Sequence, residues 1–223
     1  NSIVRGPPLL YEIFKWIIQK PSVLSVSPSL VHVFTKSSLK LKIPDLEYVM
    51  SPASFKEGTV GLLDKVSGMT LGVWQTRPKS NGYVKINSKN IHEPPIINPN
   101  YLSDPYDVDV LLKSIKIGRN LLSTSPLQPY LNGQTNPSYY LQTDDELLSW
   151  ARNEGITVYH MIGTAKMGPK SDKLAVVNNK LQVRGIESLR VADASIMPTM
   201  PSGNTNAPTM MIAEKASDMI LGK

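Results

Sequence analysis

The sequence predicts an α+β fold, in which the strands of an antiparallel sheet and the helices occupy separate stretches of the chain. Between about residues 24 and 88 the chain is rich in β-branched runs broken by Pro, Gly and Ser. Residues 104–154 instead carry two apolar patterns of helical period with recognisable start signals. The last third ends in the order strand, loop and helix. With 223 residues, 41% of them hydrophobic, the chain is long enough to bury a core in one or two domains.

A short amphipathic helix is expected near the N-terminus, behind Pro7 and Pro8. Its apolar positions recur at helical spacing until Pro21 ends the pattern. They are Leu9, Leu10, Ile13, Phe14, Ile17 and Ile18. We expect this stripe to face a core, and a membrane-surface or lid role is the alternative.

The expected strands follow as four runs, which are VLSVSPSLVHVF, DLEYVMSPASF, GMTLGVWQTR and GYVKIN. In the third run, apolar residues alternate with the set formed by Thr70, Gly72 and Trp74, which puts the two sets on opposite faces of a strand. Several such strands in succession indicate an antiparallel sheet.

Two helices are expected next. Asp104 followed by Pro105 is a helix start signal, and the apolar pattern continues to Ser123. Residues 124–142 are rich in Pro, Asn, Gln and Tyr, so we expect a long surface excursion. Thr143 and Glu146 then make a capping box, and Gly155 is expected to end the second helix.

The last third is expected to form a strand over residues 188–193, a loop over residues 194–206 and a helix over residues 207–221. Pro208 suits the first turn of this helix, and Gly222 suits its end. In such a βα unit a ligand can meet the helix N-terminus.

Composition excludes several kinds of site. The 24 Lys and Arg residues outnumber the 18 Asp and Glu residues, but they are scattered singly, so we predict no nucleic-acid function. There is no cysteine, hence no disulfide, thiolate ligand or cysteine nucleophile. The three histidines are far apart and lack metal-binding spacing. No apolar run approaches the roughly 20 residues of a transmembrane helix, and the first residues lack the order of a signal peptide.

Two segments carry a resemblance to a known family. Residues 159–168 read YHMIGTAKMG, and residues 176–220 contain LRVADAS, then SGNTNAP, then IAEK. Together they resemble the closing signature of the glucose-methanol-choline (GMC) oxidoreductases. RPKSNGYVKI at 77–86 and PPIINPNYLSDPYD at 94–107 resemble the substrate-domain segments of that family. The resemblance covers nearly all of residues 60–221 and is nearest to choline-dehydrogenase-like and aryl-alcohol-oxidase-like members.

The resemblance implies oxidation of a primary or secondary alcohol to a carbonyl, with hydride transfer to N5 of FAD. It places His160 as the acid/base, and an imidazole suits proton transfer near neutral pH. It places Asn204, the first Asn of GNTN, as the hydrogen-bond partner at the substrate oxygen. An amide donates a hydrogen bond but does not take a proton, so one titrating histidine is expected.

The family arrangement further implies five cofactor-binding positions. Thr205 and Asn206 are expected to contact the pyrimidine edge of the flavin through their backbone N–H groups, Asp193 and Ala194 are expected beside the ribityl chain, and Tyr159 near the ring. The chain accordingly divides into a substrate-binding domain at 1–170 and a segment at 171–223 that returns to the FAD-binding, Rossmann-like domain.

None of the fourteen glycines falls into G-x-G-x-x-G, the fingerprint that holds the FAD pyrophosphate. The expected partner is therefore an N-terminal FAD-binding half, in the same or a separate chain, beside a small alcohol substrate. The chain is then a fragment, a processed piece or a subunit. Met161 and Ala165 replace residues that are often Pro and Cys in the family, and neither position supplies essential chemistry.

Two alternatives to alcohol oxidation stay open. Hydroxynitrile lyases and a photodecarboxylase share this fold and flavin without oxidising alcohols. A non-catalytic binding module is the second alternative, although the presence of both His160 and Asn204 argues against it.

Overall fold

The computed structural model describes residues 1–27, 29–56 and 61–223. The described chain forms two compact units. The first unit comprises Asn1–Gln75 and Asp109–Ile156, and the second comprises Thr76–Val108 and Thr157–Lys223. Residue 28, in the first predicted strand run, and residue 60, where the family resemblance begins, lie outside the described residues. The assignment of 1–170 and 171–223 to substrate-binding and FAD-binding domains stays a prediction.

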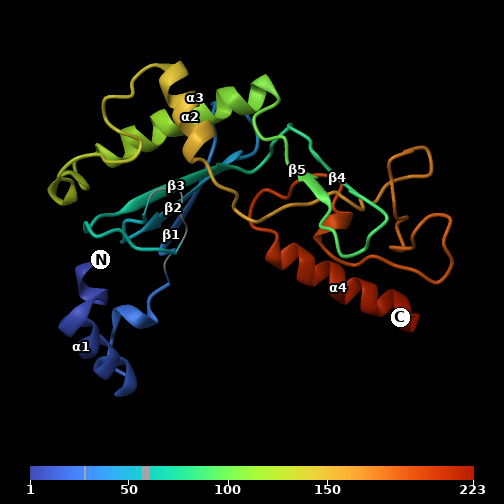
Figure 1. Cartoon of the computed structure of the whole chain (residues 1–223), viewed down its shortest axis with the longest axis horizontal. Coiled ribbons are helices and arrows are strands. Elements are labelled where there is room, and N and C mark those ends of the chain that lie inside the picture. The colour runs from blue at the N-terminus through green and yellow to red at the C-terminus, as the bar shows by residue number, and fades with distance from the viewer. Residues whose placement is uncertain (28, 57–60) are drawn as a thin grey trace. The chain divides into compact units, whose positions relative to one another are not determined.

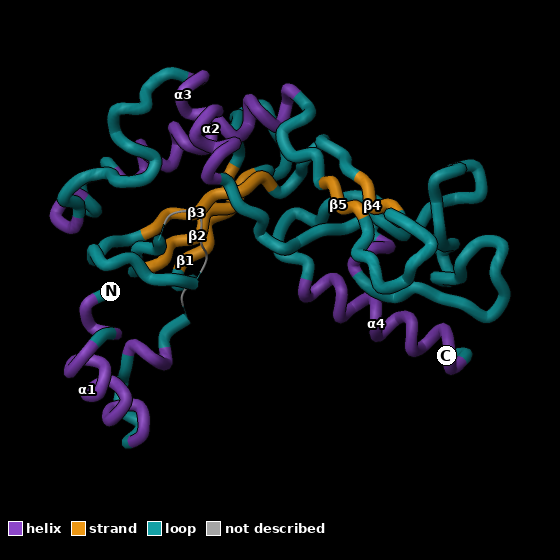
Figure 2. Tube along the Cα trace, viewed as in Figure 1, coloured by secondary structure: helices purple, strands orange, loops and turns teal. Residues whose placement is uncertain are grey.

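The first unit is built on the predicted antiparallel sheet. It contains β1 (Val31–Thr35), β2 (Leu46–Ser51) and β3 (Thr70–Gln75), in the order β1-β2-β3 with β2 at the centre (Figure 2). The start of the first predicted run differs, because Val23–Ser25 forms a 3-10 turn, η2, instead of a strand.

Two helices cover one face of this sheet. They are α2 (Pro105–Leu122) and α3 (Asp144–Glu154), close to their predicted bounds (Figure 1). The hydroxyl of the buried Tyr48 donates to the carbonyl of Ser114 on α2 at 2.7 Å. The predicted capping box of Thr143 and Glu146 is confirmed at the start of α3. The core of the unit comprises Leu46, Tyr48, Val49, Val110, Ile115, Leu147 and Ala151.

Between α2 and α3 the predicted surface excursion is confirmed. Residues 123–142 contain turns and one short 3-10 segment, η3 (Gln128–Tyr130). Arg119 of α2 donates to the carbonyls of Ser138 and Leu141 and thereby holds the far part of this excursion against the helix.

The N-terminal helix α1 (Gly6–Ile17) forms as predicted, but its apolar stripe does not face a core. Leu10, Phe14 and Ile17 are exposed, so that prediction is wrong for the described chain. The helix packs against η1 (Ser2–Val4) and η2, and these three-residue segments are too short to cover a stripe that runs along the whole helix.

The second unit contains a two-stranded antiparallel ribbon and the C-terminal helix. The strands are β4 (Tyr83–Lys85) and β5 (Ile96–Asn98), and the helix is α4 (Asn206–Leu221). Gly222 ends α4 in the left-handed conformation at φ 70°, as its type predicts. The core of the unit comprises Val177, Leu181, Ile196, Met197, Ile212 and Ala216.

The predicted strand at residues 188–193 is wrong. The segment folds back on residues 181–183 through a tight turn and makes one isolated bridge, from Gln182 to Arg190. A strand requires a partner along several successive residues, and here the partner arm is short because the chain turns again at residues 178–181, where the Leu181 N–H donates to the Asn178 carbonyl.

Candidate active site

The loop that carries His160 is anchored immediately after that residue. The turn 163–166 follows, with Gly163 at φ +89° and a hydrogen bond from the Lys166 N–H to the Gly163 carbonyl. Glycine adopts this backbone conformation without the strain that a Cβ introduces. The N–H of Ala165 then donates to the carbonyl of Ser195 at 3.0 Å, so this loop is joined to the 3-10 turn η4 (Ala194–Ile196).

The loop that carries Asn204 is anchored at both ends. Upstream, Ile196 and Met197 belong to the buried core of the unit. Downstream, Thr205 is the N-cap residue of α4, and its carbonyl accepts from the Thr209 N–H and the Thr209 hydroxyl. The side chain of Arg77 donates to the hydroxyl of Ser202, two residues before Asn204.

These two loops bring His160 between two residues of the second loop. The ring Nδ1 lies 3.0 Å from the hydroxyl oxygen of Thr205. The ring Nε2 lies 2.8 Å from the amide nitrogen of Asn204. The imidazole is half-buried, Asn204 is exposed and Thr205 is buried. One ring edge thus meets a buried hydroxyl and the other meets an exposed amide.

The contact atoms favour one protonation pattern of the ring. The Asn204 amide nitrogen is a donor only, so Nε2 must accept from it. A neutral imidazole with an acceptor at Nε2 carries its proton on Nδ1. That N–H then donates to the Thr205 hydroxyl oxygen. The arrangement presents an acceptor nitrogen beside an amide with a second N–H hydrogen.

The predicted residues around this pair lie in different settings. Tyr159 directly precedes His160 and is 76% exposed, at φ +60°. Asp193 caps η4, because its carboxylate accepts from the Ser195 N–H at 2.8 Å. Ala194 packs against the core. Asn206 is exposed and is the first residue of α4. The structure therefore gives Asp193 and Ala194 a local structural role and leaves Tyr159 and Asn206 accessible.

The start of α4 offers backbone donors that fit the polar edge of a flavin. Pro208 has no N–H, and the Thr209 N–H bonds to Thr205, which leaves Asn206 and Ala207 as first-turn donors without an intrahelical partner. The helix dipole adds partial positive charge at this end. Backbone N–H groups at a helix N-terminus can hold an electron-rich carbonyl edge, and the Tyr159 side chain in the neighbouring loop is exposed.

Sequence reasoning missed three side-chain contacts near this pair. The hydroxyl of Thr205, expected to act through its backbone, instead contacts the ring of His160. The hydroxyl of Tyr101 bonds to that of Thr157 at 3.0 Å and lies 3.8 Å from the sulfur of Met161. The third is the bond from Arg77 to the loop of Asn204. None of them has a local sequence signal, because each joins segments that are distant in the chain.

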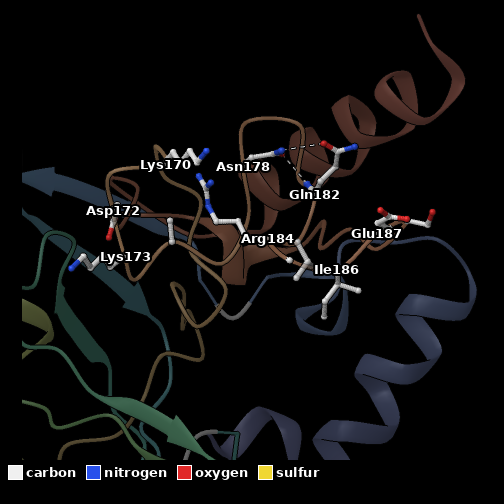
Figure 3. Close-up of a pocket in the computed structure, with 12 residues that line it drawn as sticks. Lys170, Asp172, Lys173, Asn178, Gln182, Arg184, Ile186 and Glu187 are labelled. Atoms are coloured by element: carbon white, nitrogen blue, oxygen red, sulfur yellow. Dashed lines mark hydrogen bonds between the residues drawn. The ribbon is translucent and has the colours of Figure 1, made fainter.

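A hollow of the second unit lies apart from this pair. It has a volume of about 650 Å³, is open, and is lined by residues between Lys170 and Ser188 (Figure 3). At its rim the Lys166 ammonium bonds to Asp172 at 2.8 Å and, with the Leu174 N–H, lowers the pKa of that carboxyl. Neither His160 nor Asn204 lines this hollow, so the candidate site is the accessible surface around that pair.

Within the described ranges, no group of three or more His, Cys, Asp or Glu side chains is placed to hold a metal ion. A search over the same residues finds no helix with the length and apolar character needed to cross a membrane.

Comparisons with known proteins agree with the resemblance. Residues 78–213, more than half of the chain, match the family model described as GMC oxidoreductase. The alcohol dehydrogenase (acceptor) of Pseudomonas putida is 37% identical, over 100% of this chain and 39% of that protein. The oxygen-dependent choline dehydrogenase of Photobacterium profundum is 35% identical, over 93% of this chain and 36% of that protein.

Among solved structures, a variant of the formate oxidase of Aspergillus oryzae RIB40, studied for FAD modification, has a TM-score of 0.84. Its identity is 21%, and the match covers 98% of this chain and 42% of that chain. An identity this low is evidence of fold alone. The chain spans less than two fifths of the length of the two curated relatives.

Proposed function

Because the chain belongs to the GMC oxidoreductase family, whose cofactor is FAD, we propose that it carries the catalytic pair of an FAD-dependent alcohol oxidoreductase. The reaction is the oxidation of a primary or secondary alcohol to a carbonyl. The observation that supports this most strongly is the direct contact of His160 with Asn204, because the two family-signature residues meet at the atoms that the chemistry requires.

His160 takes the hydroxyl proton of the substrate at Nε2. This nitrogen carries a lone pair in the protonation pattern that the contacts of the ring require. The proton moves from the alcohol oxygen to Nε2, and the ring becomes an imidazolium while the alcohol oxygen gains negative charge.

Asn204 stabilises the charge that develops on that oxygen. Without substrate, one N–H of its amide points to Nε2, which places an amide donor directly beside the base. A substrate hydroxyl that enters between the two side chains replaces their direct contact: it donates its proton to Nε2 and its oxygen accepts from the Asn204 amide. A donor aimed at the place where charge develops acts mainly in the transition state.

The bound FAD supplies the hydride acceptor, at N5 of its ring. On the side of this chain, the Asn206 and Ala207 N–H groups would hold the electron-rich carbonyl edge of the flavin, and Tyr159 would lie near the ring. Asp193 and Ala194 hold the turn beside the ribityl chain. The pyrophosphate is held by an N-terminal FAD-binding half, because this chain lacks G-x-G-x-x-G.

Anaerobic mixing of the FAD-loaded enzyme with a panel of small alcohols tests the proposal. The expected result is bleaching of the oxidised flavin spectrum by at least one primary or secondary alcohol, followed by transfer of electrons to an artificial acceptor. A lyase of the same fold converts its substrate while the flavin stays oxidised. Turnover without any flavin reduction would therefore reject oxidation and favour the lyase.

A further inference from the structure

We propose that Thr205 is a positioning residue whose hydroxyl accepts the Nδ1–H of His160 and so holds the ring in one orientation, with its proton on Nδ1. This inference rests on the proposed function of His160. It assigns to the Thr205 hydroxyl a role that differs from the backbone contact expected from the family resemblance.

The first support is the unusual use of a threonine at a helix N-cap. A threonine at this position ordinarily accepts from a backbone N–H of the first turn. Thr143 does so at the start of α3, where it accepts from the Glu146 N–H. Thr205 makes no side-chain cap bond at the start of α4, and its hydroxyl lies 3.0 Å from Nδ1 of His160 instead. Thr205 already has helical backbone angles, φ −86° and ψ −7°, whereas Thr143 has the extended backbone of a capping residue, so the Thr205 hydroxyl is available to the ring.

The second support is the rigidity of Thr205. Its residue is 7% exposed, which shields the bond to the ring from competing water. Its backbone carbonyl accepts from both the N–H and the hydroxyl of Thr209, at 3.0 Å and 2.7 Å. The hydroxyl oxygen therefore stands at a fixed place on the end of α4 and defines where Nδ1 must lie.

The third support comes from counting protons. If the Thr205 hydroxyl donated to Nδ1, Nε2 would carry the proton and would point it at the donor-only amide nitrogen of Asn204. A fully protonated ring would have the same conflict. The neutral ring with its proton on Nδ1 satisfies both contacts. The Asn204 amide therefore excludes a proton from Nε2, and the Thr205 hydroxyl supplies the acceptor that the remaining Nδ1–H needs.

In the reaction this contact has a second consequence. When Nε2 takes the alcohol proton, the ring carries an N–H at both nitrogens, and the Nδ1–H still donates to Thr205. The new Nε2–H points to the substrate oxygen, which has displaced the Asn204 amide from Nε2, so the ring keeps its orientation in the neutral and the charged state. A fixed acceptor behind a catalytic base preserves its orientation through the step, as in other acid–base sites.

The test compares Thr205→Val, which is close in size and lacks the hydroxyl, with Thr205→Ser, which keeps it. In the FAD-loaded enzyme, Thr205→Val is expected to lower the rate constant of flavin reduction about 10- to 100-fold, well short of the loss for a fully misoriented base. Substrate affinity should change less than about threefold, because Thr205 is not expected to touch the substrate. Thr205→Ser should keep most of the rate.

A readout independent of activity comes from ¹⁵N NMR of enzyme labelled at histidine. The wild-type resonances of His160, assigned by their loss in His160→Ala, should show a protonated Nδ1 and an unprotonated Nε2. Thr205→Val should move the proton toward Nε2, and Thr205→Ser should restore the wild-type pattern. Thr143→Val is the matched control, because it removes the hydroxyl of the other N-cap threonine. It should lower stability but change neither the spectrum nor the reduction rate.

An unchanged His160 spectrum in Thr205→Val, or equal losses in the Val and Ser variants, would overturn the inference. If Thr205→Val does not load flavin, Thr205→Cys is used in its place, because a thiol is small and only a weak hydrogen-bond acceptor. A wild-type ¹⁵N spectrum of His160 in the Cys variant would also overturn the inference. The proposed function fails separately, if His160→Ala reduces its flavin normally. In that case the ¹⁵N spectrum still reports whether the Thr205 hydroxyl holds the His160 ring with its proton on Nδ1.

Discussion

The amide nitrogen of Asn204 lies 2.8 Å from Nε2 of His160, although the two residues are 44 positions apart in the chain. Each loop is held by the core of the second unit, so the contact does not depend on local sequence. Because the amide nitrogen of Asn204 can only donate a hydrogen bond, Nε2 of His160 is the acceptor in this contact. The pair therefore presents a base and a hydrogen-bond donor to the same point in space.

The first prediction concerns the base. His160→Ala in the FAD-loaded enzyme is expected to lower the rate of alcohol-dependent flavin reduction about 10²-fold or more, the scale for loss of acid–base catalysis. Bound flavin should be retained, since its expected contacts on this chain are largely backbone groups. Stopped-flow absorbance of the flavin under anaerobic conditions measures the rate, and the ratio of flavin to protein measures retention.

His92→Ala is the matched control, because His92 is exposed and its backbone N–H bonds to nearby Asn90. It should reduce flavin at the wild-type rate. Near-normal reduction by His160→Ala would show that another group takes the proton.

The second prediction concerns the pH dependence of the N-terminal helix. The carboxylate of Glu12 accepts from Lys15, the Val23 N–H and the Ser22 hydroxyl, and these bonds lower its pKa from 4.5 to about 2. A lowered folded-state pKa stabilises the fold above pH 4.5, and the contribution is lost as the pH falls toward about 2. The Val23 amide NMR shift, followed during acid titration, should change near pH 2.

Glu12→Gln tests the cause of that shift. The variant keeps a side chain of similar size but has no carboxylate to titrate, so the Val23 amide should lose its acid transition. A wild-type midpoint near 4.5 would contradict the prediction, since it would mean that the bonds to Lys15 and Val23 do not favour the charged form.

The third prediction concerns FAD binding by these 223 residues alone. Expressed without an FAD-binding half, the chain is expected to bind FAD weakly or not at all, because it has no G-x-G-x-x-G loop for the pyrophosphate. The accessible donors of Asn206 and Ala207 are too few to hold the whole cofactor. Titration followed by flavin fluorescence measures the affinity. A stoichiometric yellow complex would refute the expectation.

The parts of the fold that could be predicted are those with local signals. Pro105 and the capping box of Thr143 mark the starts of α2 and α3, and Gly222 marks the end of α4, all within about one residue of the observed bounds. Such signals work because a cap or a fixed φ acts within one turn of the chain. The antiparallel sheet was likewise predictable from its alternating runs.

The parts that could not be predicted depend on partners that are distant in sequence. Whether the apolar stripe of α1 is buried, and whether residues 188–193 pair as a strand, both depend on which segment lies opposite them in the folded chain. Periodicity gives the apolar face of an element but does not name its partner. At the site, the family signature indicated His160 and Asn204. It did not indicate that the hydroxyl of Thr205 turns away from its helix toward the ring.

The last prediction separates chemistry from packing at Asn204. If its amide donates to the substrate oxygen mainly as charge develops, Asn204→Ala should lower flavin reduction on the order of 10- to 10³-fold and weaken substrate binding much less. Asn204→His should retain more activity than Asn204→Ala, because an imidazole can also donate a hydrogen bond. Rapid-mixing measurements over a range of alcohol concentrations give the rate constant and the apparent affinity separately.

Asn206→Ala is the matched control, since Asn206 is also exposed, lies two residues away and is expected to act through its backbone N–H. That group survives the substitution, so the loss should be milder than at Asn204. The comparison of the two variants also assigns the roles of Asn204 and Asn206 if Asn206→Ala causes the larger loss of activity. A larger chemical loss at Asn206, or an effect of Asn204→Ala confined to substrate affinity, would mean that the contact with Nε2 positions the ring and that another donor meets the substrate oxygen.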